Sequence, residues 1–349
     1  MYKIDFIKHI AVFNEPGGTS RGVLYQKPSW IIRLQHSDFE KVGFGEISII
    51  PKLSIESEDD VDNFLKKNNQ LSDNQIKDIL TEATPAIRFG FEMALKSLEN
   101  QALEMYGSKN PINLKTNGLV WMGNFEEMQR RAIEKYSSGF RCLKFKIGAH
   151  QFDEELNFLN SIRNKWPEIE IRLDANGAFS PHDALEKLKQ LSELNIHSIE
   201  QPIKAKQWQE MAQLCIDSPI DIALDEELIG IKSKAEKEEI LRTISPQYLI
   251  FKNSLIGGWK ECEEWIELAE KQNVKWWSTS ALELNVGLNA IAYQLTHHNN
   301  ALPQGLGTGK VFTNKLPSNL VLKNDVLQKT NPEDLLYQSC LNLFDGLAN

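Results

Sequence analysis

Cysteine is scarce in this chain of 349 residues, and its few cysteines are scattered. They are Cys142, Cys215, Cys262 and Cys340. No two of them have the CxxC spacing of a zinc site, and this pattern does not fit a disulfide framework. We therefore expect four reduced thiols in the cytosol.

The chain also lacks long apolar runs and an excess of positive charge. The first residues, Met1–Asp5, do not form the apolar run of a signal peptide, and no stretch approaches the length of a membrane-spanning helix. The formal net charge is −9, which argues against nucleic acid as a main partner. We expect a soluble cytoplasmic enzyme with no nucleic-acid or membrane partner, as a monomer or a homo-oligomer.

The first part of the chain has the pattern of a small α+β domain. Three segments rich in β-branched and aromatic residues predict an antiparallel meander. These segments are Ile4–Phe13, Val23–Leu34 and Val42–Ile50, separated by turn-forming residues at 14–18 and 36–38. Amphipathic patterns then predict helices over Glu58–Asn68, over Asp73–Glu82, and from Pro85 through Leu98.

From Asn117 onward, an apolar strand followed by an amphipathic helix recurs along the chain. The predicted strands are Gly118–Met122, Cys142–Ile147, Ile169–Asp174, Ile196–Glu200, Ile220–Asp225, Tyr248–Lys252, Val274–Thr279 and Ala301–Leu306. Eight such units favour a (β/α)8 barrel over an open doubly wound sheet. The last strand has a weak pattern, so a barrel of seven units is the alternative.

The predicted domain organisation follows from this change of pattern. We place an α+β capping domain at residues 1–110 and a modified (β/α)8, TIM-like barrel at 111–315. The tail, 316–349, has a mixed pattern and is expected to pack back on the capping domain.

Carboxylates stand at the ends of three consecutive predicted strands: Asp174, Glu200 and Asp225. In a barrel these ends meet at one mouth, where three carboxylates would repel one another unless a divalent cation neutralised them. All-oxygen ligation suits Mg²⁺, and the absence of histidine at these strand ends argues against zinc. Taken singly, Asp225 fits a helix N-cap and Glu200 a solvated loop residue.

Lysines stand on the strands at either side of these carboxylates. Side chains alternate along a strand, so Lys144 and Lys146 point to the same face. Lys252 ends the sixth predicted strand, which lies across a barrel from the second. A ligand bound at the carboxylates would therefore meet an ammonium group from each side. The alternatives are an exposed edge strand protected by its lysines, and a surface charge at Lys252.

The set Lys144-x-Lys146, Asp174, Glu200, Asp225 and Lys252 resembles the enolase superfamily, in its muconate-lactonising-enzyme-like subgroup. That resemblance implies a capping domain and a modified barrel. Further stretches are similar to the o-succinylbenzoate synthase family. They are Ser20–Leu24, Pro85–Gly90, Asn117–Gly123, Lys252–Gly258 and Ser278–Glu283.

The resemblance also implies roles and a reaction. The three carboxylates would hold Mg²⁺, with Mn²⁺ as a substitute. Lys146 would act as general base and then as general acid, with Lys144 beside it, and Lys252 would stabilise the developing anion from the opposite face. The implied reaction is syn-dehydration of a small carboxylate, 2-succinyl-6-hydroxy-2,4-cyclohexadiene-1-carboxylate, to 2-succinylbenzoate in menaquinone biosynthesis.

Two other functions would use parts of the same pattern. An N-acylamino acid racemase or dipeptide epimerase would use the same metal site, with Lys146 and Lys252 both exchanging the α proton. Dipeptide epimerases carry Asp-x-Asp at the end of strand eight, where this chain has Gly305–Gly309 and no acid. A metal-independent barrel that binds a phosphate ligand at Gly305–Gly309 would not need the three carboxylates.

Two residues and one segment are further candidates for roles in the site. Arg172 and Asn176 share the face of Asp174, so they are candidates for contacts to the substrate or to the metal ligands; a structural ion pair is the alternative for Arg172. The segment Pro16–Arg21 resembles a lid supplied by the capping domain, and an ordinary hairpin loop is the other interpretation.

Overall fold

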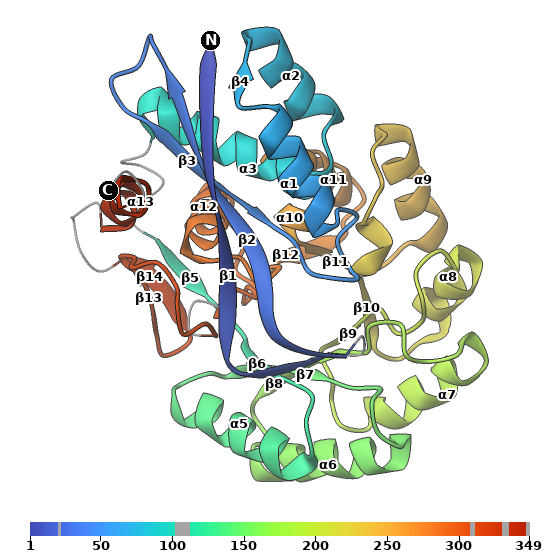
Figure 1. Ribbon diagram of the computed structural model, residues 1–349. Helices are drawn as coiled ribbons and strands as arrows, with labels where there is room; N and C mark the ends of the chain where they lie inside the picture. Colours follow the sequence, from blue (N-terminus) through green and yellow to red (C-terminus); the bar gives the residue numbers. More distant parts are fainter. Residues whose placement is uncertain (20–21, 102–111, 308–310, 330–334, 347–349) are drawn as a thin grey trace.

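Three sheets organise the chain (Figure 1). The computed structural model describes residues 1–19, 22–101, 112–307, 311–329 and 335–346. A four-stranded sheet, which we call the capping sheet, has the order β3-β2-β1-β4, and a seven-stranded parallel sheet runs in order from β12 to β6. A small sheet, β13-β14-β5, lies at the side. No helix of the described ranges is long and apolar enough to cross a membrane.

The capping sheet contains the predicted antiparallel meander. Its strands are β1 (Tyr2–Thr19), β2 (Gly22–His36), β3 (Gly43–Ser48) and β4 (Gln70–Leu71). The turn predicted at residues 14–18 is wrong, because β1 continues through this stretch with a register shift between Val12 and Gly17. A shift of this kind bends a strand without ending it.

One face of the capping sheet packs on helices of the same part of the chain. They are α1 (Glu58–Lys67), α2 (Asp73–Glu82) and α3 (Pro85–Lys96). Trp30 and Ile32 face these helices, whereas Ile31 between them joins the core that continues into the barrel. This alternation is the two-residue period of a strand buried on both faces. Ser57 and Ser72 close capping boxes that begin α1 and α2.

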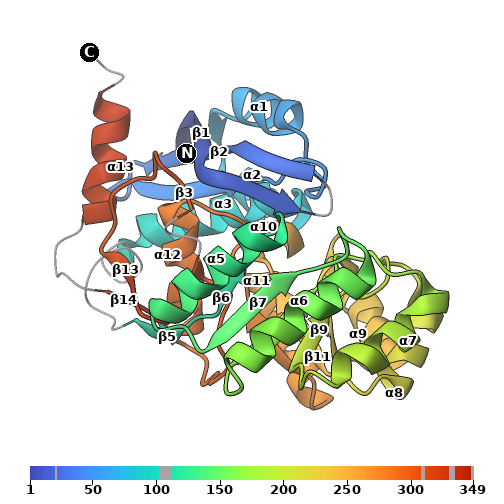
Figure 2. The ribbon, with the colours of Figure 1, turned by 90° about the horizontal axis from the view of Figure 1, so that it is seen from below.

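The parallel sheet and its helices form the predicted repeat. The strands are β6 (Gly118–Val120), β7 (Cys142–Lys146), β8 (Glu170–Asp174), β9 (Ser198–Glu200), β10 (Asp221–Leu224), β11 (Tyr248–Phe251) and β12 (Lys275–Ser278). The helices are α5 (Phe125–Ser137), α6 (Phe152–Lys165), α7 (Pro181–Ser192), α8 (Trp208–Asp217), α9 (Lys234–Ile244), α10 (Asn253–Ile256), α11 (Trp259–Lys271) and α12 (Asn285–Leu295). Figure 2 shows α6, α7 and α8 on the outer side of the strands.

The eighth unit is reduced to two residues. The amide of Asn117, directly before β6, donates to the carbonyl of Gln304 over 2.8 Å, and the amide of Gly305 donates to the carbonyl of Ser278 over 2.7 Å. These bonds join the two ends of the parallel sheet and close the barrel. The strand predicted over 301–306 is therefore only a pair of bridges, which explains its weak pattern.

The tail contacts more than one part of the molecule. β14 (Val326–Lys329) lies between β13 (Leu320–Lys323) and β5 (Asn113–Lys115) and pairs with both. Helix α13 (Leu335–Asp345) lies against the capping sheet, where the rings of Phe344 and Phe44 stack with centroids 5.9 Å apart. The predicted domain boundary near residue 110 falls outside the described residues, so the division into domains stays a prediction.

Candidate active site

Three carboxylates converge at the mouth of the barrel. Asp174 ends β8, Glu200 ends β9, and Asp225 follows β10 directly. One carboxylate oxygen from each lies within 4.8 Å of the others. All three residues are buried, with Glu200 fully inaccessible, so the solvated-loop interpretation of Glu200 is wrong. Asp225 makes no side-chain cap bond, so the N-cap interpretation is wrong as well.

Strand register explains why the carboxylates meet. Lys146 pairs with Asp174 across β7 and β8, and Asp174 pairs with Glu200 across β8 and β9. Glu200 pairs in turn with Ala223, two residues before Asp225, so both point to the same face. Neighbouring parallel strands therefore bring their last inward side chains to one level.

Two lysines of β7 reach into this cluster. Lys144 Nζ lies 3.0 Å from Asp174 Oδ2 and also forms an ion pair with Glu200. Lys146 Nζ donates to Asp174 Oδ2 over 2.9 Å and to Asn176 Oδ1 over 2.7 Å. Strand β7 lies between β6 and β8, so the edge-strand interpretation is wrong.

Lys252 approaches from the opposite side of the barrel. It follows β11, and β11 is separated from β7 by three strands of the sheet. Its Nζ forms a buried ion pair with Asp225, which rules out a surface charge. We call these six side chains the mouth group: Lys144, Lys146, Asp174, Glu200, Asp225 and Lys252.

Burial and mutual repulsion act on the charges of the mouth group. Burial raises the pKa of Glu200 to about 7; the Lys144 ammonium opposes this increase, and the Asp174 and Asp225 carboxylates add to it. Burial alone would lower the pKa of Lys144, but the three carboxylates outweigh it and raise that pKa above its ordinary value. The ionised carboxylates therefore favour additional positive charge.

The mouth group fits a divalent cation. Glu200 Oε1 is buried and has no hydrogen-bond partner among the described residues. A buried carboxylate oxygen without a partner is costly, and a cation would satisfy it. The three candidate ligands supply oxygen alone, which suits a hard cation that keeps positions for water or substrate oxygen.

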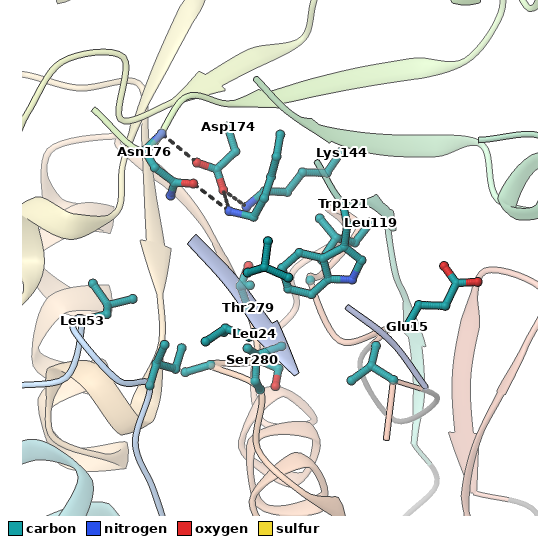
Figure 3. A pocket seen from close by; sticks show the side chains of 18 of the residues that line it. Glu15, Leu24, Leu53, Leu119, Trp121, Lys144, Asp174, Asn176, Thr279 and Ser280 are labelled. Carbon is teal, nitrogen blue, oxygen red and sulfur yellow. Dashed lines mark hydrogen bonds and ion pairs between the residues drawn. The ribbon is translucent and has the colours of Figure 1, made fainter. Parts of the chain in front are cut away.

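A cavity of about 780 Å³ extends from the mouth group toward the capping sheet (Figure 3). Lys144, Asp174 and Asn176 lie at one side of the cavity in this view, with Leu53 and Glu15 farther out. The barrel also contributes Leu119, Trp121, Thr279 and Ser280, and the capping sheet and the loop after it contribute Leu24, Tyr25, Gln26 and Leu53. A charged floor with largely apolar walls is typical of a small-molecule site.

The remaining candidates from the sequence, Arg172 and Asn176, lie in different places. Arg172 is fully buried below the mouth, where its Nε donates to Glu170 over 2.7 Å and its guanidinium lies 4.2 Å from the centre of the Trp277 ring. Its role is therefore a structural ion pair, whereas Asn176 contacts Lys146 within the site. Ser20, Arg21, Thr308 and Gly309 lie outside the described residues.

Sequence reasoning did not identify the apolar walls of the cavity. Leu24, Leu53 and Trp121 come from three separate segments, and nothing in their local pattern distinguishes them from core residues. The only available signal was that Leu24 and Trp121 fall in stretches similar to the o-succinylbenzoate synthase family.

Comparison with known proteins agrees with this architecture. The family model described as enolase C-terminal domain-like matches residues 127–327. A curated relative, o-succinylbenzoate synthase from Desulfotalea psychrophila, is 41% identical over 93% of this chain and 98% of its own length.

Solved structures are similar along nearly the whole chain. The crystal structure of MenC from Desulfotalea psychrophila matches with a TM-score of 0.81 and 37% identity, covering 94% of this chain and 99% of its own. The muconate lactonizing enzyme from Pseudomonas fluorescens, complexed with muconolactone, matches with a TM-score of 0.85 and 20% identity over 98% of both chains. The latter similarity concerns the fold alone. The predicted capped, TIM-like barrel is confirmed.

Proposed function

This chain belongs to the enolase C-terminal domain-like family, and from that premise we propose that it is an o-succinylbenzoate synthase. The reaction is the dehydration of 2-succinyl-6-hydroxy-2,4-cyclohexadiene-1-carboxylate to 2-succinylbenzoate, a step of menaquinone biosynthesis. The observation that carries this proposal is the mouth group itself. It sets three carboxylates between Lys146 and Lys252, which come from opposite sides of the barrel.

Asp174, Glu200 and Asp225 are the proposed ligands of Mg²⁺, with Mn²⁺ as a substitute. A bound Mg²⁺ would supply positive charge next to the substrate carboxylate and so lower the cost of removing the neighbouring proton. Lys144, held between Asp174 and Glu200, adds a fixed ammonium group to the same region.

Lys146 is the proposed general base and general acid. Its Nζ takes the proton from the carbon α to the substrate carboxylate. The C–O bond to the β-hydroxyl then breaks, and Lys146 returns the proton to the departing hydroxyl, which leaves as water. One lysine serves both steps only if proton and hydroxyl leave from the same face, so the elimination is syn. The ring becomes aromatic, which makes the step downhill.

Lys252 is proposed to act through its charge. It stands across the mouth from Lys146, where its ammonium group stabilises the negative charge that develops as the α proton leaves. Asn176 accepts a hydrogen bond from Lys146 and thereby helps to orient the base.

The four cysteines are free, and all but Cys215 are buried. This supports the predicted cytoplasmic location as part of the same proposal.

The test compares two substrates in D₂O with purified protein and Mg²⁺. We expect rapid formation of 2-succinylbenzoate from the cyclohexadiene acid, followed by the ultraviolet absorbance of the product. An N-succinyl amino acid reports racemisation through deuterium incorporation with inversion. Deuterium exchange without any dehydration would contradict the proposal and identify a racemase. Substrate binding that is unchanged by EDTA would instead favour a metal-independent barrel.

A further inference from the structure

A second group of buried polar side chains lies between the capping sheet and the barrel. The barrel-facing side of β2 and β3 carries Ile31 and Phe44, which join the main core. The same side also carries polar residues that are almost completely inaccessible: Lys27, Ser29, Glu46 and Ser48. Buried polar groups are costly unless each finds a partner, so the partners of this group define what it does.

Glu46 bonds to the start of a barrel helix. Its Oε1 accepts from the amide of Leu284 over 2.8 Å, and its Oε2 accepts from the amide of Gly287 over 2.9 Å. These are among the free amides at the beginning of α12, and Leu284, at the N-cap position, supplies no side-chain cap bond of its own. A carboxylate of the capping sheet therefore caps a helix of the barrel. Figure 1 and Figure 2 both show α12 next to β3.

Gly287 makes this close approach possible. A Cβ atom at this position would lie 2.7 Å from Cβ of Glu283 and 3.2 Å from Oε2 of Glu46. Glycine inside a helix is less favourable than alanine, so its presence here is explained by the space that the two glutamates occupy.

Glu283, four residues before Gly287, forms hydrogen bonds with the wall of the cavity. Its Oε1 accepts from Ser254 Oγ over 2.6 Å, and its Oε2 accepts from Ser280 Oγ over 2.5 Å. Ser280 lines the cavity together with Thr279, Ala281 and Leu282. The hydrogen bond from Ser280 to Glu283 therefore holds the cavity wall at the end of β12. The hydrogen bonds to Glu46 hold the start of α12, the helix that follows.

Lys27 completes the group from the capping sheet. Its Nζ donates to Ser29 Oγ over 2.8 Å and to Ser48 Oγ over 2.7 Å, and Ser29 Oγ donates to Glu46 over 3.0 Å. Burial lowers the pKa of Lys27 to about 8, against the opposing charges of Glu46 and Glu283. We call Lys27, Glu46 and Glu283 the interface group.

The interface group reaches the wall of the cavity through Ser280, which donates to Glu283 and lines the cavity. Gln26, which precedes Lys27 on β2, also lines the cavity. The mouth group, by contrast, stands on or directly after β7 to β11, and within the described part of the chain it shares no hydrogen bond with Glu46 or Glu283. A change in the interface group should therefore move a wall without moving the reacting lysine.

We propose that Glu46 is a positioning residue that fixes the 279–284 wall of the cavity relative to the capping sheet, and so sets the fit of the substrate arm that does not react. The proposal rests on the proposed function, because the arm in question is the succinyl arm of the dehydration substrate. Misplacing a wall weakens binding of that arm more than it slows the chemical step.

The chain offers two matched controls for Glu46→Gln. Glu92, on α3, accepts from the amide of Trp259 over 2.5 Å and so caps the barrel helix α11, whose first residues do not line the cavity. Glu56, also buried, accepts from the amide of Ala86 over 2.7 Å and caps α3 within the capping part. Both Glu→Gln changes remove a carboxylate at a helix start away from the cavity.

The experiment measures kcat and KM for dehydration, together with hydrogen exchange of the backbone. For Glu46→Gln we expect KM to rise by about tenfold with kcat changed by less than about threefold. Exchange in the peptide covering 279–288 should become at least about tenfold faster. Glu92→Gln and Glu56→Gln should leave both KM and exchange in that peptide unchanged.

Two results would overturn the proposal: a KM for Glu46→Gln within about twofold of wild type, or an equal rise in KM for Glu92→Gln. If Glu46→Gln does not fold, Ser254→Ala removes one bond to Glu283 from outside the cavity and must raise KM in the same direction. If the wild-type protein does not dehydrate the substrate, the proposed function fails. Unchanged exchange over 279–288 in Glu46→Gln would refute the positioning role on its own.

Discussion

The interface group and the mouth group both bury charged side chains, but their hydrogen bonding differs. In the interface group, both carboxylate oxygens of Glu46 and both of Glu283 accept hydrogen bonds. In the mouth group, three carboxylates crowd together and Glu200 Oε1 has no partner among the described residues. The carboxylates of both groups are almost completely inaccessible to solvent, so burial alone does not distinguish them.

The difference separates a structural role from a functional one. A buried carboxylate with every oxygen bonded has been satisfied by the fold, and it stabilises the arrangement around it. Three buried carboxylates crowded together cost stability in the protein alone, and this cost points to a cation that binds there. The following substitutions test whether this distinction holds.

The largest effect is expected at the mouth, for Lys146→Ala. Loss of the proposed base should lower kcat for dehydration by about 10³-fold, while calorimetry should still detect cation binding. Lys275→Ala is the matched control, because Lys275 is exposed at the other end of the barrel, where β12 begins. Near-normal turnover in Lys146→Ala would remove the proposed base.

Glu200→Gln should separate function from stability. Divalent-cation affinity should fall by about 100-fold or more, because a charged ligand is lost. The unfolding temperature of the metal-free protein should fall by no more than about 2 °C, since the change also relieves repulsion with Asp174 and Asp225. A large loss of stability without metal would mean that the mouth group is structural after all.

Glu283→Gln should show the opposite pattern. The free energy of unfolding should fall by about 1–3 kcal/mol, because the new amide cannot accept from both Ser254 and Ser280. Cation affinity should stay unchanged in calorimetry. If stability stays the same and cation affinity falls, the two groups are not independent.

The smallest effect concerns Glu92, a carboxylate outside both groups, which caps α11. Burial raises its pKa to about 7, above the ordinary value of 4.5. The folded protein therefore binds more protons than the unfolded protein between these values, and this contribution to stability is lost as the pH rises from 4.5 to 7. The slope is at most about 1.4 kcal/mol per pH unit.

Urea unfolding of wild type and Glu92→Gln across this pH range checks the sign. The difference in free energy of unfolding between the two proteins should change with pH in that window and be constant above it. A difference that does not vary between pH 4.5 and 7 would show that Glu92 titrates normally.

The mouth group could be predicted from the sequence because its members stand at or near the ends of strands, and the local pattern shows where each strand ends. Asp174 and Glu200 each end an apolar strand, and parallel neighbours align such ends automatically. The same reasoning reached the barrel and the capping meander. It overestimated the eighth strand, since two bridging residues leave almost no pattern, and it mistook the bulge in β1 for a turn.

The interface group could not be predicted, because its contacts depend on tertiary packing. Glu46 and Leu284 are separated by 238 positions, and no periodicity connects them. The available signal was a contradiction within the capping sheet: Lys27, Ser29, Glu46 and Ser48 occupy strand positions that alternate with buried apolar residues. Polar residues on a buried strand face indicate a specific partner, but the sequence does not say which.

Cation dependence tests the central claim most directly. The protein is stripped with EDTA, and dehydration is measured during titration with Mg²⁺ while calorimetry records binding in parallel. If the crowded carboxylates at the barrel mouth await an ion, turnover should be lost on chelation and return in proportion to occupancy of a single site per chain. Full-rate dehydration by the stripped protein would contradict this account.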